Sequence, residues 1–150
     1  SEMCIRDRSN FEIILKKKSI NLHLDLMEPT LVFGDNDKLL TVFSNLIDNS
    51  IKYSQNGKNI YVNSQNSEGK LIDKNIVISI KDEGVGIPQQ LIPRITERFF
   101  RVDEEKSKKA GGTGLGLAIM KHIISQHRGD YEILSKVDKG TEVKIYLPTK

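Results

Sequence analysis

The chain has 150 residues and a mass of 17.0 kDa, a size that suits one globular domain. Hydrophobic residues make up 37% of it and charged residues 29%, which excludes a disordered chain and is ordinary for a globular one. The net charge of +3 comes from scattered lysines, so we expect no nucleic-acid partner. No apolar run approaches the roughly 18 residues that cross a bilayer, so we do not expect this segment to be membrane-inserted. Cys4 is the single cysteine, which excludes an internal disulfide framework.

The first half of the chain predicts a strand followed by a helix. Residues 1–8 follow neither helical nor strand periodicity, and we interpret them as a non-native leader in front of a domain over 9–150. Alternating leucines predict a strand over 21–26. The turn at 34–37 offers N-cap residues, and the apolar spacing after it predicts a helix that ends near Ser54.

The second half predicts two pairs of strands around a long irregular stretch and a helix. We expect the first pair near 60–63 and 76–80. A charged stretch with Gly and Pro follows over 83–112, a length typical of a functional lid. A helix over 114–127 then leads into the last two strands, near 131–135 and 142–147. This order predicts an α+β fold with a mixed sheet and helices on one face.

Two asparagines and a lysine lie on one face of the first predicted helix. Asn45, Asn49 and Lys52 are spaced by four and three residues. Asparagine is a mediocre helix former, so two of them beside an apolar stripe suggest a function. Their amide oxygens could bind a hard cation such as Mg²⁺, and the lysine could meet phosphate. The alternative is that the amides only satisfy nearby backbone groups.

A carboxylate and two alternate glycines follow the strand predicted at 76–80. In the run Asp82-Glu83-Gly84-Val85-Gly86, the glycines allow a ligand to approach the backbone closely. Asp82 could accept a hydrogen bond from an exocyclic amino group. The alternative is an ordinary tight turn.

The second predicted helix begins in a glycine-rich loop. Four glycines occur between Gly111 and Gly116, and the free N–H groups at a helix N-terminus favour phosphate. The loop is not a Walker motif, because no Gly-Lys-Ser/Thr follows, and no strand precedes it directly as in a dinucleotide fingerprint. The interleaved apolar residues Leu115, Leu117 and Ile119 disfavour a merely flexible hinge.

Together these segments resemble the catalytic domain of two-component sensor histidine kinases. The N, G1, F, G2 and G3 boxes of that family resemble, in order, residues 45–53, 82–86, 97–101, 112–117 and 140–141. The resemblance covers essentially the whole domain. It implies the GHKL-type (Bergerat) fold, a two-layer α/β sandwich with a mostly antiparallel mixed sheet, helices on one face and a mobile ATP lid.

The resemblance also implies a role for each matching residue, with ATP and Mg²⁺ as cofactors. Asn49 would ligate Mg²⁺, and Asn45 and Lys52 would support the metal and the phosphates. Tyr53 would pack on adenine, and Asp82 would accept from its amino group.

Other matching residues are implied in the pocket and in catalysis. Arg98 or Arg101 would meet the terminal phosphate when the lid closes, and with Lys52 they are the expected catalytic residues. Glycines and neighbouring residues would shape the adenine pocket and cradle the phosphates: Gly84, Gly86, Ile87, Gly112, Thr113, Gly114, Leu115, Gly116, Leu117 and Thr141.

Three departures from the family pattern stand out. Ser50 replaces the usual alanine, a small-for-small exchange that we expect to be silent. Thr96 replaces an aromatic residue, a variant similar to the phosphate-regulon sensor kinases. The phosphoacceptor motif is absent: His23, His122 and His127 have none of its sequence context.

The resemblance therefore implies a kinase fragment that is inactive alone. It would transfer the γ-phosphoryl of Mg·ATP to a histidine on an upstream dimerisation hairpin, for relay to a response regulator. The domain would be cytoplasmic, and its parent a membrane-bound homodimer of the bacterial inner membrane.

Three alternatives remain open. A gyrase-, Hsp90- or MutL-like ATPase carries a glutamate where this chain has Asn45, an amide that cannot act as a base. A serine kinase of the anti-sigma type is nearer, but the F-box resemblance favours histidine. A non-enzymatic nucleotide-binding module would require the lid arginines to be idle.

Overall fold

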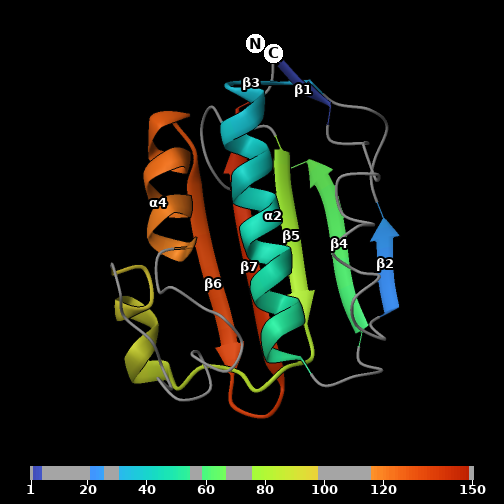
Figure 1. Cartoon of the computed structure of the whole chain (residues 1–150), viewed down its shortest axis with the longest axis vertical. Coiled ribbons are helices and arrows are strands. Elements are labelled where there is room, and N and C mark those ends of the chain that lie inside the picture. The colour runs from blue at the N-terminus through green and yellow to red at the C-terminus, as the bar shows by residue number, and fades with distance from the viewer. Residues whose placement is uncertain are drawn as a thin grey trace.

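The computed structural model describes residues 2–4, 21–25, 31–54, 59–66, 76–97 and 116–148. These form two layers, a five-stranded sheet and two helices that cover one of its faces (Figure 1). The elements are β1 (Glu2–Cys4), β2 (Asn21–Asp25), β3 (Leu31–Phe33), α2 (Asn36–Tyr53), β4 (Asn59–Asn66), β5 (Ile76–Asp82), the 3₁₀ helix η1 (Gln89–Arg94), α4 (Gly116–Gln126), β6 (Asp130–Lys136) and β7 (Gly140–Leu147).

The sheet is mixed and mostly antiparallel. Its strand order is β2-β4-β5-β7-β6, and only β2 and β4 run parallel. The chain between these two parallel strands includes α2, as parallel neighbours require a crossover. The expected α+β two-layer fold with helices on one face is confirmed.

The core lies between the helix layer and the sheet. Apolar side chains of α2 at helical spacing and alternate side chains of the strands meet there. The largest side chains with less than 2% exposure are Leu39, Val42, Ile47, Ile60, Ile76, Ile80, Met120, Ile124, Ile145 and Leu147. This packing holds α2 against the central strand β5, which places the C-terminal end of α2 beside the loop that follows β5.

Most predicted elements are present, with small differences at their ends. The first helix begins at Asn36 with Asp35 as its N-cap, whose side chain accepts from the backbone N of Lys38, and Ser54 is its C-cap. Within the stretch expected to be irregular, Gln89–Arg94 forms a short 3₁₀ helix that follows Pro88.

One small sheet has no counterpart in the sequence prediction. Glu2–Cys4 pairs antiparallel with Leu31–Phe33, although no element is expected in residues 1–8 from their periodicity. Three residues are too few to show an alternation, so the pairing depends on the tertiary fold. The interpretation of residues 1–8 as a non-native leader stays a prediction.

The end of α4 is tied to the start of α2 through a histidine. Nε2 of His127 accepts from the backbone N of Asp35 at 2.9 Å, and its Nδ1 donates to the carbonyl of Ile123 at 2.7 Å. Both ring nitrogens therefore have partners, with the ring in its neutral Nδ1–H tautomer. None of the described helices is long and apolar enough to cross a membrane.

Candidate functional site

Asp82 is a buried carboxylate at the end of β5, with 8% of its surface exposed. Its Oδ1 accepts from the backbone N of Gly84 at 2.9 Å and from the backbone N of Thr141 at 3.1 Å. Burial raises the pKa of the Asp82 carboxyl above its usual value, and hydrogen bonding by the Gly84 and Thr141 backbone and by the Ser50 side chain opposes that shift. The fold therefore buries an acceptor here that is held by the loop after β5 and the start of β7.

Two glycines make this arrangement possible by allowing close backbone contacts. A Cβ at Gly84 would lie 2.6 Å from the carbonyl oxygen of Tyr53, at the C-terminal end of α2. A Cβ at Gly140 would lie 2.1 Å from the carbonyl oxygen of Asp82, and Gly140 has a φ of +114°. Any larger residue at either position would displace the loop after β5 or the start of β7.

The loop after β5 is anchored to the β6–β7 hairpin through Ser135. The backbone N of Ile87 donates to the Ser135 hydroxyl at 2.8 Å, and this hydroxyl lies 2.7 Å from Oγ1 of Thr141 and 3.0 Å from the carbonyl of Gly140. Gln89 also donates to the Ser135 carbonyl. The structure thus joins Ile87 and Thr141, which were both predicted for the site, through a residue that sequence reasoning missed. A serine near the end of β6 carries no local signal of this role.

The asparagines of α2 face the start of α4. A Cβ at Gly116 would lie 3.7 Å from Nδ2 of Asn49 and 3.8 Å from Cβ of Asn45. Both asparagines are half-buried. The fold therefore places Gly116, the first residue of α4, beside these two side chains.

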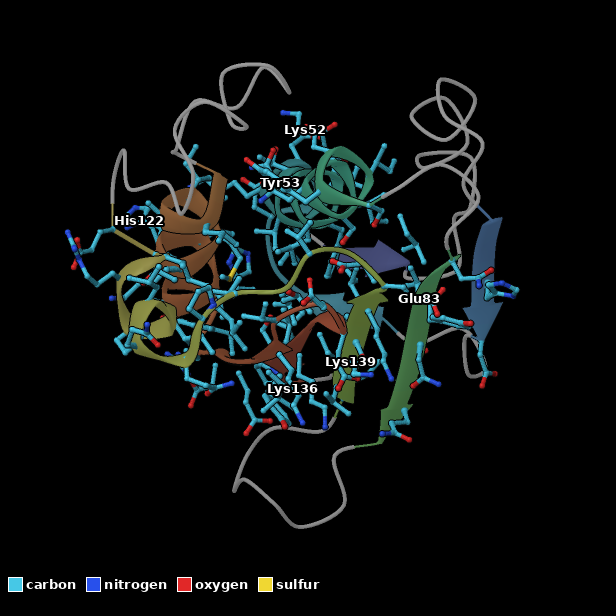
Figure 2. The ribbon with its side chains drawn as sticks, turned by 90° about the horizontal axis from the view of Figure 1, so that it is seen from below. Lys52, Tyr53, Glu83, His122, Lys136 and Lys139 are labelled. Carbon is cyan, nitrogen blue, oxygen red and sulfur yellow. The ribbon has the colours of Figure 1, made fainter. Side chains whose placement is uncertain are left out.

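Lys52 and Tyr53 lie at the C-terminal end of α2. Lys52 is half-buried and forms an ion pair of 2.9 Å with Asp48, one turn earlier. Tyr53 is half-buried as well. Figure 1 shows the C-terminal end of α2, the end of β5 and the β6–β7 turn at the same end of the molecule, and Figure 2 looks onto that end, where it labels Lys52, Tyr53, Glu83 and Lys139. The helix end, the loop after β5 and the hairpin therefore form one edge of the molecule.

Several predicted site residues lie outside the described residues. These are Arg98, Arg101, Gly112, Thr113, Gly114 and Leu115. Leu117 lies in the first turn of α4 and packs against the hydrophobic core. Gly86, with a φ of +74°, lies against the carbonyl of Lys136. The structure thus brings the described members of the predicted N, G1, G2 and G3 segments to one end of the fold.

The fold is a two-layer sandwich with a buried carboxylate after its central strand. Side-chain amides on one helix also face the N-terminus of the other helix. This combination defines a class of nucleotide-binding ATPase domain. The chain belongs to the family of histidine kinase-, DNA gyrase B- and HSP90-like ATPases, whose sequence profile matches residues 34–150. The family and the fold predicted from the motif boxes are confirmed.

The relatives of this chain are sensor kinases. The sensor-like histidine kinase SenX3 of Mycolicibacterium smegmatis is 35% identical over 140 residues, which are 93% of this chain and 35% of that protein. The phosphate regulon sensor protein PhoR of Haemophilus influenzae is 39% identical over 132 residues, 87% of this chain and 30% of the relative. The sensor histidine kinase WalK of Bacillus subtilis is 42% identical over 117 residues, 77% of this chain and 18% of the relative. The chain therefore spans about a third or less of these relatives.

The solved structures with the same fold include histidine kinases. The mycobacterial sensor histidine kinase MprB has a TM-score of 0.84 and 26% identity, with 100% of this chain and 97% of that chain covered. The catalytic domain of histidine kinase ThkA shares the fold, with a TM-score of 0.80, 24% identity, and coverage of 99% and 95%. The chain is thus a histidine-kinase-type ATPase domain, and this reading fits better than the gyrase-type or anti-sigma-type alternatives.

Proposed function

We propose that this domain binds Mg·ATP at the edge formed by the end of α2, the start of α4 and the loop after β5. The adenine would lie at Asp82 and the phosphates between Asn49 and the start of α4. The observation that carries this proposal is the meeting of Gly116 with Asn45 and Asn49. The side-chain amides on one face of α2 lie beside the N-terminus of α4, a position that favours the binding of phosphate.

The base end of the proposed site selects for an amino group. Asp82 is an acceptor whose Oδ1 is fixed by Gly84 and Thr141. Adenine offers an exocyclic amino donor at the corresponding edge, whereas guanine presents a carbonyl oxygen. A buried carboxylate without a donor is costly, so we expect ATP to bind and GTP to be rejected.

The metal end uses side-chain amides. Asn49, supported by Asn45, would offer an amide oxygen to Mg²⁺, a hard cation that prefers oxygen ligands. The described residues contain no cluster of three His, Cys, Asp or Glu side chains that could hold a metal alone. This fits an ion held by one or two protein oxygens together with phosphates and water. Bound Mg²⁺ would neutralise part of the charge on the triphosphate.

The transfer of the γ-phosphoryl group would rest on positioning and charge. Lys52 would exchange its ion pair with Asp48 for the phosphates, and Arg98 or Arg101 would meet the terminal phosphate. Asn45, an amide, cannot act as the base that activates water. The acceptor would be a histidine on a dimerisation hairpin of the parent protein rather than water.

The partners follow from the relatives, which are named as sensor kinases. The proposal adds a dimerisation and phosphoacceptor hairpin of the same kinase and a downstream response regulator. It also places the domain in the cytoplasm, with a membrane-bound homodimeric parent in the bacterial inner membrane. The similarity to three sensor proteins over this domain supports this arrangement.

Calorimetry of ATP binding with and without Mg²⁺ tests the proposal. The wild-type domain should bind ATP more tightly with Mg²⁺, and Asn49→Ala should remove this metal dependence because the amide oxygen is lost. Asn49→Asp keeps the size but adds a charge, and should weaken or distort Mg·ATP binding.

The matched control is Asn63→Ala. Asn63 is also half-buried but lies on β4, where it donates to Asp25. It should leave ATP binding unchanged with or without metal. Identical behaviour of wild type and Asn49→Ala would remove Asn49 from the site, and a wild-type domain that does not bind ATP would overturn the proposal.

A further inference from the structure

We propose that Ser135 is a positioning residue of the base pocket: its hydroxyl fixes the Thr141 hydroxyl as a hydrogen-bond acceptor for the amino group of adenine. This inference rests on the proposed function, because it assigns a second source of the selectivity of that pocket. Ser135 acts through Thr141 and does not itself touch the nucleotide.

Ser135, Thr141 and Asp82 form a row across the end of three neighbouring strands. Ser135 on β6 is the register partner of Thr141 on β7. The register of β7 with β5 continues to Asp82, whose Oδ1 accepts from the backbone N of Thr141 at 3.1 Å. Ile80 and Val143, two residues away along β5 and β7, belong to the core. Because side chains alternate along a strand, the row lies on the face of the sheet that the helices cover.

The hydrogen bonds of the Ser135 hydroxyl use its full capacity. A hydroxyl has one proton to donate and can accept two hydrogen bonds. Oγ of Ser135 donates to the carbonyl oxygen of Gly140 at 3.0 Å and accepts from the backbone N of Ile87 at 2.8 Å. It also lies 2.7 Å from Oγ1 of Thr141, and because its own proton is already used, Thr141 is the donor of this bond. The Thr141 hydroxyl is then left with acceptor capacity only.

This polarity of Thr141 matches that of Asp82. An ionised carboxylate also only accepts hydrogen bonds, and Asp82 is 8% exposed. Two neighbouring acceptors suit an amino group, which donates. They disfavour a carbonyl oxygen, because acceptors that face one another out of water stay unpaired. Ser135 therefore adds to the selectivity that the proposed function assigns to Asp82.

A simpler role for Ser135 would be to hold the loop after β5 in place through Ile87. That loop has a second tie to the hairpin, since the backbone N of Asp138 donates to the carbonyl oxygen of Val85 at 2.9 Å. A loop that is merely loosened would bind every purine nucleotide less well. A changed polarity of Thr141 would instead affect the nucleotide that carries the amino group. The two roles therefore differ in a measurable ratio of affinities.

The experiment compares two nucleotides that differ only at the base edge. These are ATP and purine riboside 5′-triphosphate, which carries hydrogen in place of the amino group. Calorimetry with Mg²⁺ would measure both affinities for wild type, Ser135→Ala, Ser135→Thr, Thr141→Val and the double variant Ser135→Ala/Thr141→Val. Ser135→Thr keeps the hydroxyl, and a β-branched residue suits a strand.

We expect Ser135→Ala to weaken ATP by about three- to tenfold, as for the loss of one hydrogen bond. Purine riboside triphosphate should be weakened less, so the ratio of the two affinities should fall. Ser135→Thr should restore the wild-type ratio. Thr141→Val should lower the ratio as well, and adding Ser135→Ala to it should lower the ratio no further, because Ser135 acts through the hydroxyl that is already lost.

Ser79→Ala is the matched control. Ser79 is also a half-buried strand serine whose hydroxyl donates a hydrogen bond, in this case to Glu142. It alternates with the core residues Ile78 and Ile80 along β5, so its side chain lies on the other face of the sheet. Ser79→Ala should leave both affinities at the wild-type level.

The Ser135 proposal is overturned if Ser135→Ala keeps the wild-type ratio, whether by binding ATP normally or by weakening both nucleotides equally. It is also overturned if Ser135→Thr behaves like Ser135→Ala, or if Ser135→Ala lowers the ratio by the same factor with and without the Thr141 hydroxyl.

Asp82→Asn distinguishes this failure from a failure of the proposed function. It should lower ATP affinity by about tenfold or more, because an amide can turn a donor toward the amino group. If wild type does not discriminate between the nucleotides and Asp82→Asn binds like wild type, the base pocket itself is misassigned. If Asp82→Asn loses the discrimination while Ser135→Ala keeps it, only the role of Ser135 is wrong.

Discussion

At the scale of single residues, Asp82 is a carboxylate that the fold buries before any ligand arrives. Burial raises the pKa of its carboxyl above the usual value of 3.8, and three hydrogen bonds only partly oppose this. The nucleotide-free domain therefore bears a free-energy cost for keeping Asp82 ionised. Such a cost is typical of binding sites, where a residue is placed for a ligand and not for stability.

This cost predicts how the stability of the nucleotide-free domain depends on pH. Because the folded pKa lies above the unfolded one, the contribution of Asp82 is fully present below the usual carboxyl pKa. It is lost as the pH rises through the folded value. As the pH rises through this range, we expect the free energy of unfolding of wild type to fall relative to that of Asp82→Asn. Urea unfolding of both proteins across a pH series would measure the difference.

The difference in unfolding free energy between wild type and Asp82→Asn reports on Asp82 alone, because all other carboxylates are the same in the two proteins. A difference in unfolding free energy that stays constant with pH would contradict the raised pKa. A difference that changes in the opposite direction would show that hydrogen bonds outweigh burial at Asp82.

At the scale of elements, α2 is fixed at both ends by different contacts. Its start is tied to the end of α4 through His127 and Asp35. Its end lies against Gly84, whose missing side chain leaves room for the carbonyl of Tyr53. The helix that carries the two asparagines is therefore positioned relative to both α4 and the loop after β5.

The link through His127 predicts a stability effect remote from the proposed site. His127→Ala removes one hydrogen bond to the Asp35 backbone and one to the Ile123 carbonyl. We expect a loss of about 1–2 kcal/mol in the free energy of unfolding, measured by urea denaturation. His122→Ala is the matched control, because His122 is exposed on the same helix and should change stability little.

An equal effect of the two substitutions would show that the hydrogen bonds of His127 are not what stabilises this junction. A loss confined to His127→Ala would show that the contact between the two helices contributes to the fold as a whole.

At the scale of the whole molecule, the described residues of the proposed site lie at one end of the fold (Figure 1), and the three histidines have other surroundings. His23 lies exposed on β2, stacked on Tyr61 with ring centroids 4.8 Å apart, and hydrogen-bonded to Asn59. His122 is exposed on α4, and His127 is engaged at the junction of the helices. We therefore expect none of the three histidines to accept phosphate.

We therefore predict that the purified chain binds ATP but neither labels itself nor hydrolyses ATP at a useful rate. Intramolecular transfer has no target, and without a carboxylate at Asn45 the activation of water loses a factor of about 10²–10⁴. Incubation with γ-labelled ATP would show this. Adding a separately expressed dimerisation hairpin with its histidine should restore labelling in trans.

Arg101→Ala provides the second arm of this experiment. It should lower transfer to the hairpin while sparing nucleotide affinity, because the arginine would meet the terminal phosphate only during transfer. Rapid self-labelling of the chain, or brisk phosphate release without the hairpin, would place the domain in a different branch of its family.

Local pattern alone determined most elements of this fold. Leucines in alternation and the cap at Asp35 predict β2 and α2 because strand and helix periodicities are properties of short segments. The glycine loops and the asparagine pair are equally visible in the sequence, because each is a local run of unusual residues. The ordered set of these segments was sufficient to assign the family.

Only the tertiary structure decided which of these residues meet. The approach of Gly116 to Asn49 and the link of Ile87 to Thr141 through Ser135 both join distant segments. Serine is common and fits many environments, so a single serine in a helix or strand carries no signal of its partner. The role of Ser135 follows from packing, because the fold brings its hydroxyl within hydrogen-bond distance of Ile87 and Thr141.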